Sequence, residues 1–234
     1  MMEKWKCLSG STLKLLAVVC MLIDHLAAFL WVDNPAFREV LFTFHARPIT
    51  PYFLCRAVGR IAFPLFAFLI VEGFQHTHSR KHYAFNLLLF ALLSEIPWNL
   101  VHGGWLCPRQ NVLFTLLLGC LGLCALERWK DNAKYLALSI IGLFVVSIFL
   151  RADYGYVGFA FILMLYVLRG CAPVQAVVGC AMLPTHLIAG LSFIPINLYN
   201  GRRGFIHGPV GKYLFYSFYP LHLLVIALLK NLPC

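Results

Sequence analysis

Residues 12–32 read TLKLLAVVCMLIDHLAAFLWV, an apolar run that is interrupted by Lys14, Asp24 and His25. About 20 apolar residues are enough for a helix to cross the hydrocarbon core of a bilayer. The basic residues before this run resemble the start of a secretory signal peptide. The apolar part of a signal peptide, however, does not normally contain an acid beside a histidine. We therefore predict a retained first membrane helix with two titratable side chains inside it.

The composition of the whole chain agrees with this prediction. Of its 234 residues, 61% are hydrophobic and 12% are charged, and the mean hydropathy is +0.80. Soluble domains carry about 25% charged residues, so the composition excludes the soluble globular and disordered classes. We predict an all-α, polytopic transmembrane helix bundle of about eight spans, with seven as the alternative, in one integral membrane domain of residues 1–234. The predicted spans are residues 12–32, 57–75, 83–101, 111–127, 134–150, 155–169, 173–194 and 212–230.

The distribution of lysine and arginine predicts that both chain termini lie on the inner side of the membrane. Loops on the cytoplasmic side of membrane proteins carry an excess of these residues. With an inner N-terminus and eight spans, the inner set is Lys4, Lys6, Lys14, Arg80, Lys81, Arg128, Lys130, Lys134, Arg169 and Lys230, and the smaller outer set is Arg38, Arg47, Arg109, Arg151, Arg202 and Arg203. Such loops and contact with anionic lipid account for the net charge of +10. We therefore expect the lipid bilayer as a partner, and no nucleic acid.

Cysteine and histidine do not predict disulfides or a metal site. The nine cysteines are an odd number, form no Cys-x-x-Cys pair and lie mostly in apolar runs, as buried small hydrophobic residues do. His76, His78 and His82 share a loop with Arg80 and Lys81, and these cations disfavour a bound metal ion. We predict a solvated loop, or a docking surface for a phosphorylated cofactor, and no metal.

Three acidic residues, Asp24, Glu72 and Glu95, lie inside predicted spans. An ionisable side chain at the centre of a membrane helix costs about 2.5–3.5 kcal/mol on insertion scales. These acids must therefore face the interior of the bundle and find partners there. Glu72 precedes His76 by one helical turn. Acids retained at this cost indicate a function.

Asp24 and His25 are the first candidates for catalysis. Adjacent residues on a helix point about 100° apart, so each needs a partner on a different helix. An imidazole, with its ordinary pKa of about 6.5, suits a general base at neutral pH. The alternative is a structural pair that fixes helix packing.

Arg56 and Arg60 are four residues apart and share one helix face. Pro64 lacks the amide that would bond the Arg60 carbonyl, so we expect a kink there. The two arginines either bind a phosphate or carboxylate of a substrate, or neutralise Asp24 and Glu95.

Two polar pairs at helical spacing follow in the next spans. Glu95 and Asn99 lie one turn apart around Pro97, which frees the carbonyl of the residue four positions earlier. Asn111 and Thr115 repeat this spacing, and here hydrogen bonding between helices is the favoured role.

The last predicted span carries Lys212, Tyr216 and Tyr219 at the spacing of one helix face. An aromatic belt at the membrane interface explains Tyr213 and is the alternative for Tyr216. It does not explain His222, which lies deeper, beside Pro220. The candidate substrate-binding residues include Lys212, Tyr216, Tyr219 and His222.

Taken in order, these motifs resemble the TraX family over about residues 12–230. The residues that carry the resemblance are Asp24-His25, Gly59-Arg60-Ile61-Ala62-Phe63-Pro64, Glu72-Gly73-Phe74, Ser94-Glu95-Ile96-Pro97, Asn111 with Thr115, and Lys212 to His222 with Tyr216 and Tyr219. The family is named for a conjugation-plasmid protein that N-acetylates pilin, and it is similar to transmembrane acyltransferases more broadly.

The resemblance implies an enzyme of the bacterial inner membrane that moves an acetyl group from acetyl-CoA to an amine or hydroxyl acceptor. A pilin-like peptide and a surface glycan are acceptor classes, and homo-oligomers are possible. The family's intramembrane histidine corresponds to His25, with Asp24 orienting or balancing the charge of the site. Arg60, Lys212 or a tyrosine would stabilise the oxyanion. A proton-coupled transporter is the alternative, because kinked helices and intramembrane acids also suit transport.

Overall fold

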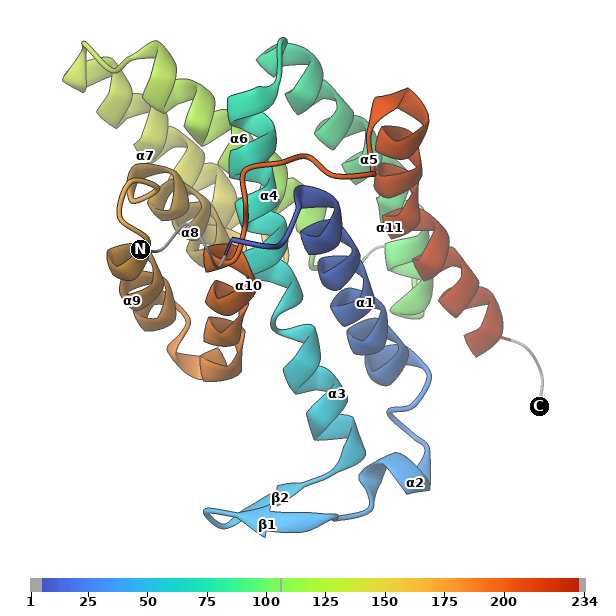
Figure 1. Ribbon diagram of the computed structural model, residues 1–234. Helices are drawn as coiled ribbons and strands as arrows, with labels where there is room; N and C mark the ends of the chain where they lie inside the picture. Colours follow the sequence, from blue (N-terminus) through green and yellow to red (C-terminus); the bar gives the residue numbers. More distant parts are fainter. Residues whose placement is uncertain (1–5, 106, 232–234) are drawn as a thin grey trace. The chain divides into compact units, whose positions relative to one another are not determined.

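The computed structural model describes residues 6–105 and 107–231, with the side chains of 184–187 excepted. It is built from helices, with one short β-hairpin (Figure 1). The predicted all-α membrane bundle is confirmed. Five helical stretches in the described part of the chain are long and apolar enough to cross a membrane: Gly10–Phe29, Pro51–His76, Arg80–Val101, Ala133–Leu150 and Gly208–Lys230.

The chain divides into two compact units, and each is described by itself. The first unit comprises residues 1–66, 100–102 and 183–234, and the second comprises residues 67–99 and 103–182. Elements of the first unit are α1 (Gly10–Phe29), α2 (Pro35–Arg38), β1 (Phe42–Phe44), β2 (Arg47–Ile49), α3 (Pro51–Gly59), the 3-10 helix η2 (Pro184–Ser192), α10 (Phe193–Asn197) and α11 (Gly208–Lys230). Helices α4 (Ala62–His76) and α5 (Arg80–Val101) have residues in both units, and the second unit adds α6 (Val112–Arg128), α7 (Ala133–Leu150), α8 (Gly155–Val167) and α9 (Ala172–Met182).

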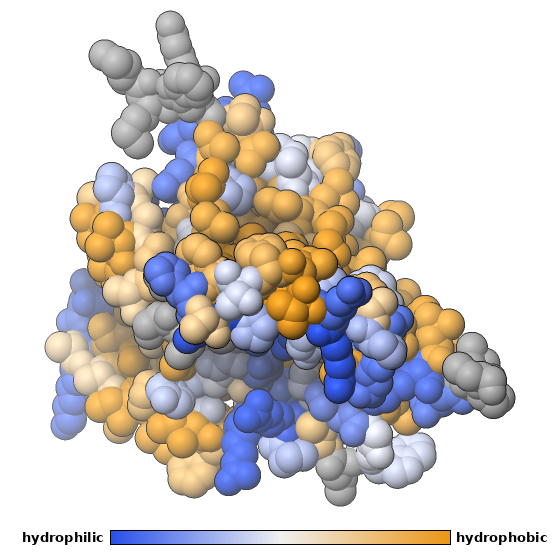
Figure 2. Space-filling model, turned by 90° about the horizontal axis from the view of Figure 1, so that it is seen from below, coloured by the Kyte–Doolittle hydropathy of each residue, from blue (hydrophilic) through white to orange (hydrophobic). Residues whose placement is uncertain are grey.

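The second unit exposes apolar side chains as a membrane protein does. On α7, Leu138, Ile141 and Phe149 are 67%, 61% and 80% exposed. In lipid such side chains face a medium that is as apolar as they are. Figure 2 shows hydrophobic residues reaching the surface over much of the face seen there. We conclude that the chain is a membrane protein.

The start of α1 is held by the segment that precedes α11. The first amides of a helix have no partner within it. Here the amide of Gly10 donates to the carbonyl of Arg202 at 2.8 Å, and that of Ser11 donates to the carbonyl of Arg203 at 2.9 Å. Residues 202 and 203 therefore lie at the N-terminal end of α1.

Helices α1 and α11 run in the same direction, as Figure 1 shows in blue and red. Near their starts, the Lys14 ammonium lies 5.2 Å from the centre of the Phe215 ring, and further along both helices His25 contacts His222. Two parallel helices that both cross a membrane have their C-terminal ends on the same side. Lys230, at the end of α11, therefore lies at the opposite end of this helix pair from Arg202 and Arg203.

The predicted span at residues 173–194 differs from the structure. The structure has no continuous helix there: α9 ends at Met182, and a 3-10 helix begins at Pro184. A residue that precedes proline is disfavoured in the helical conformation, so the helix stops at this point. Without that span the chain changes direction one time fewer.

A second difference concerns the predicted kink at Pro64. The break lies earlier, because α3 ends at Gly59 and α4 begins at Ala62. Pro64 consequently lies in the first turn of α4, where a missing amide costs no intrahelical hydrogen bond.

Gly59 allows α3 to approach α1 closely. A Cβ atom at this position would overlap the side chain of Asp24. We expect Gly59→Ala to lower the free energy of unfolding by about 1–3 kcal/mol, as overpacking does. Thermal unfolding in detergent, followed by circular dichroism, measures the loss. Gly142→Ala on α7 is the matched control, since nothing lies within 4 Å of a Cβ there. Equal melting temperatures for the two variants would contradict the prediction.

Candidate active site

A pair of histidines lies at the centre of the first unit. Nδ1 of His25, on α1, is 2.7 Å from Nε2 of His222, on α11. The two ring planes differ by 4°, and their centroids are 5.0 Å apart. His222 is buried, at 7% exposed, whereas His25 is half-buried. An imidazole that is both held and accessible is suited to proton transfer.

Asp24 forms an ion pair with α3. Its Oδ2 lies 2.7 Å from Nη1 of Arg56, and both side chains are mostly buried, at 17% and 26% exposed. The same Nη1 also donates to the Asp24 carbonyl at 3.4 Å. Asp24 and His25 thus have partners on different helices, as their adjacent positions predict. Arg56 acts here as the counter-ion of Asp24, one of its two predicted roles.

Aromatic rings surround His25. The centroid of its ring is 5.8 Å from that of Phe29 and 6.1 Å from that of Tyr219, and the ring of His102 is 5.1 Å from that of Phe29. Tyr219 is buried and meets His222 edge to face. We therefore describe the site as an imidazole pair with an aromatic wall.

Sequence reasoning missed His102, Phe29 and Phe218 in this site. His102 directly follows the third predicted span, so its place at the end of an apolar run was a usable signal. The contribution of Phe218 is its backbone carbonyl, which accepts a hydrogen bond from Nδ1 of His222 at 2.7 Å. No side-chain pattern reports such a contact.

Lys212, Tyr216 and Arg60, the other predicted residues of the first unit, make contacts outside the histidine pair. Lys212 lies 5.4 Å from the centre of the Tyr213 ring and about 15 Å from His222 along the helix axis. The Tyr216 ring lies 6.4 Å from that of Phe215. Arg60 lies at the C-cap of α3, where its amide bonds the carbonyls of the preceding turn. Of the predicted face on α11, Tyr219 contacts the rings of both histidines.

Four further predicted residues lie in the second unit, and two of them, Glu95 and Asn111, hold the start of α6. The Asn111 amide donates to Glu95 at 3.1 Å, and its side chain bonds both Glu95 and the Ala91 carbonyl. Asn111 also caps α6, because its Oδ1 accepts from the Leu113 amide at 3.0 Å. The hydrogen bonding predicted between helices is therefore present between α5 and α6.

Asn99 and Thr115 support the neighbouring loops. The Asn99 side chain accepts from the Cys107 amide at 2.7 Å, and the Thr115 hydroxyl donates to the Asp153 carbonyl. Each of these side chains provides a hydrogen-bond partner to a backbone group that secondary structure leaves unpaired. These contacts give Asn99 and Thr115 a structural role.

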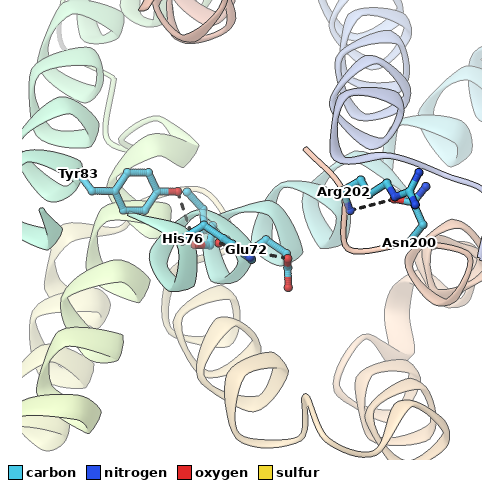
Figure 3. Close-up of polar contacts among 6 residues, drawn as sticks. Glu72, His76, Tyr83, Asn200 and Arg202 are labelled. Carbon is cyan, nitrogen blue, oxygen red and sulfur yellow. Dashed lines mark hydrogen bonds and ion pairs between the residues drawn. The ribbon is translucent and has the colours of Figure 1, made fainter. Parts of the chain in front are cut away.

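Glu72 also lies in the second unit, at the end of α4 (Figure 3). Its Oε2 is 3.8 Å from Nδ1 of His76, and the same nitrogen donates to the Glu72 carbonyl at 2.9 Å. Tyr83 nearby donates to the Ile70 carbonyl at 3.5 Å. Glu72 and His76, one helical turn apart in the sequence, are therefore neighbours at the end of α4. In the described part of the chain, no three His, Cys, Asp or Glu side chains are grouped to hold a metal ion.

Comparison with known proteins gives the family. Residues 9–230 match the TraX protein family. The chain is 27% identical to the probable fimbrial assembly protein FimC, serogroup H1, of Dichelobacter nodosus, over 95% of this chain and 96% of that protein. No solved structure matches. The protein is therefore a membrane protein of the TraX family.

Proposed function

We propose that this protein is a membrane acetyltransferase, which moves an acetyl group from acetyl-CoA to an amine or hydroxyl. The observation that carries the proposal is the pairing of the half-buried His25 with His222 at 2.7 Å inside two membrane helices. A neutral imidazole held by a second group is the arrangement of an activated base. The name of the fimbrial assembly relative favours subunits of surface fibres as one acceptor class, alongside surface glycans.

In the direct route, the amine nitrogen or hydroxyl oxygen of the acceptor bonds to the acetyl carbonyl carbon, and His25 accepts the proton that this atom loses. The C–S bond of the thioester then breaks, and the proton passes from His25 to the leaving sulfur. In the second route, His25 carries the acetyl group between donor and acceptor. Both routes yield acetylated acceptor and free CoA, and both need a neutral imidazole.

The Asp24–Arg56 pair supports this chemistry electrostatically. A lone carboxylate or guanidinium beside the imidazole would add a net charge in a medium of low dielectric. At 2.7 Å the two charges compensate each other. His25 thus accepts a proton beside an ion pair that has no net charge.

The second unit holds two arginines against aromatic rings. The Arg169 guanidinium lies 4.0 Å from the centre of the Tyr166 ring, and Arg80 lies 4.6 Å from that of Phe74. Arg80 is 3.5 Å from Glu127, which Tyr166 also bonds. These contacts place both guanidinium groups at one end of the unit.

Acetyl transfer is the direct test. The purified protein in lipid nanodiscs receives acetyl-labelled CoA with a panel of peptide amines and glycans. We expect labelled acceptor and an equal amount of free CoA, and neither in empty nanodiscs. Failure to bind CoA, together with proton-driven substrate flux into protein-containing liposomes without acetyl-CoA, would establish the transporter alternative.

A further inference from the structure

We infer that His222 is a positioning residue that fixes the tautomer of His25, so that Nε2 of His25 is the nitrogen that reacts. The inference deepens the proposed function and rests on it. It follows from hydrogen bonds that join Phe218, His222 and His25 in series.

The series begins at the backbone of α11. The Phe218 carbonyl lies 2.7 Å from Nδ1 of His222. A carbonyl oxygen can only accept, so Nδ1 of His222 carries the hydrogen. The lone pair of a neutral His222 is therefore on Nε2.

The next hydrogen bond joins His222 to His25 on α1 and determines which nitrogen of His25 carries hydrogen. Nε2 of His222 faces Nδ1 of His25 at 2.7 Å, and the ring planes are almost parallel. The centroid separation of 5.0 Å is close to this N···N distance plus two ring radii, so the rings meet edge to edge in one plane. The hydrogen bond then points along the lone pair. Nδ1 of His25 must donate, and the lone pair of a neutral His25 is on Nε2.

If Nε2 of His222 instead donated a hydrogen bond to Nδ1 of His25, both nitrogens of His222 would carry hydrogen. That would create a cation on a side chain that is 7% exposed. The acid adjacent to His25 in the chain, Asp24, is paired with Arg56 at 2.7 Å. A buried charge without a close counter-ion is costly. The neutral tautomer series avoids this cost.

Nε2 of His25 is not used by the hydrogen bonds that hold the ring. In residues 6–105 and 107–231 it makes no hydrogen bond, and the side chain is half-buried. When Nε2 takes up a proton or an acetyl group, Nδ1–H still donates to His222, which donates to the Phe218 carbonyl. Neutral His222 thus orients the base, as a carboxylate does in a serine-hydrolase triad. It does so without a further buried charge.

Two substitutions separate this role from simple packing. In His222→Gln, the side-chain oxygen can still accept from Nδ1 of His25. In His222→Leu, the volume is retained and the acceptor is lost. We expect kcat for acetyl transfer to fall about 10- to 100-fold in His222→Leu with little change in KM, and to stay within about 10-fold of wild type in His222→Gln.

The second measurement does not depend on activity. Nitrogen-15 NMR of histidine-labelled protein in nanodiscs reports which ring nitrogen carries hydrogen, and the signals of His25 are those lost in His25→Gln. We expect hydrogen on Nδ1 and not on Nε2 in wild type and in His222→Gln. We expect a shift toward the other tautomer in His222→Leu.

Hydrogen on Nε2 of His25 in the wild type would overturn the inference, even if His222→Leu does not fold. Equal loss of kcat in both variants with an unchanged tautomer would also overturn it. The inferred tautomer in a wild-type protein that transfers no acetyl group would overturn the proposed function and leave the tautomer assignment standing.

Discussion

His25→Ala is expected to lower kcat for acetyl transfer by about 10²- to 10⁴-fold, the usual contribution of a general base. The variant removes the nitrogen that accepts the proton and leaves the half-buried site otherwise intact. Label transfer from acetyl-CoA to an acceptor measures the loss. If His25 instead carries the acetyl group, the variant also loses the labelled protein intermediate that a rapid acid quench would trap in wild type.

The matched control is His207→Ala. His207 is exposed, lies at the N-cap of α11 and makes no capping hydrogen bond through its side chain. We expect wild-type kcat for this variant. His25→Gln serves as a second variant of similar size, so that a loss of folding can be recognised from its melting temperature. Wild-type turnover in folded His25→Gln and His25→Ala would refute the assignment of His25.

Arg56→Gln is expected to lower the free energy of unfolding by about 3 kcal/mol. Removing one partner of a mostly buried ion pair leaves the other charge uncompensated, at a cost of about 3–5 kcal/mol for a fully buried pair. Asp24 and Arg56 retain 17% and 26% exposure, so the lower end of this range applies. Unfolding by denaturant in detergent, followed by circular dichroism, measures the loss.

The double variant Asp24→Asn, Arg56→Gln tests the cause. Because neither charge remains, we expect it to recover most of the stability that Arg56→Gln loses. Arg38→Gln is the control, since the Arg38–Asp33 pair at 3.0 Å is 62% and 89% exposed and such pairs contribute at most about 1 kcal/mol. A double variant that is less stable than Arg56→Gln would show that the ion pair is not what the single substitution disrupts.

The helical membrane class could be predicted because it depends on local sequence. Lipid requires each spanning segment to satisfy its own backbone, so a long apolar run predicts a helix by itself. The same reasoning identified the acids inside the apolar runs. It failed at residues 173–194, where composition alone did not show that α9 stops at Met182, before Pro184.

The candidate site could be predicted only in part. The spacing of polar residues singles out Glu95 and Asn111, and the structure places them at the cap of α6. A sequence signal for this existed, because asparagine directly before an apolar run is typical of an N-cap. Lys212 shares a helix face with Tyr219 but lies about two turns from Tyr219 and nearly three turns from His222. A helix face runs the whole length of the helix, so residues on one face can be far apart.

The sequence by itself determined that the protein is a helical membrane bundle and that Asp24 and His25 are costly residues within its first span. Hydrophobic length and the free energy of burying charge are sufficient for both conclusions. Only the tertiary structure decided the partners: Arg56, 32 positions from Asp24, and His222, 197 positions from His25. It also decided that α11 runs parallel to α1. Such contacts depend on the direction and packing of whole helices, and the spacing of residues along one chain segment carries no information about either.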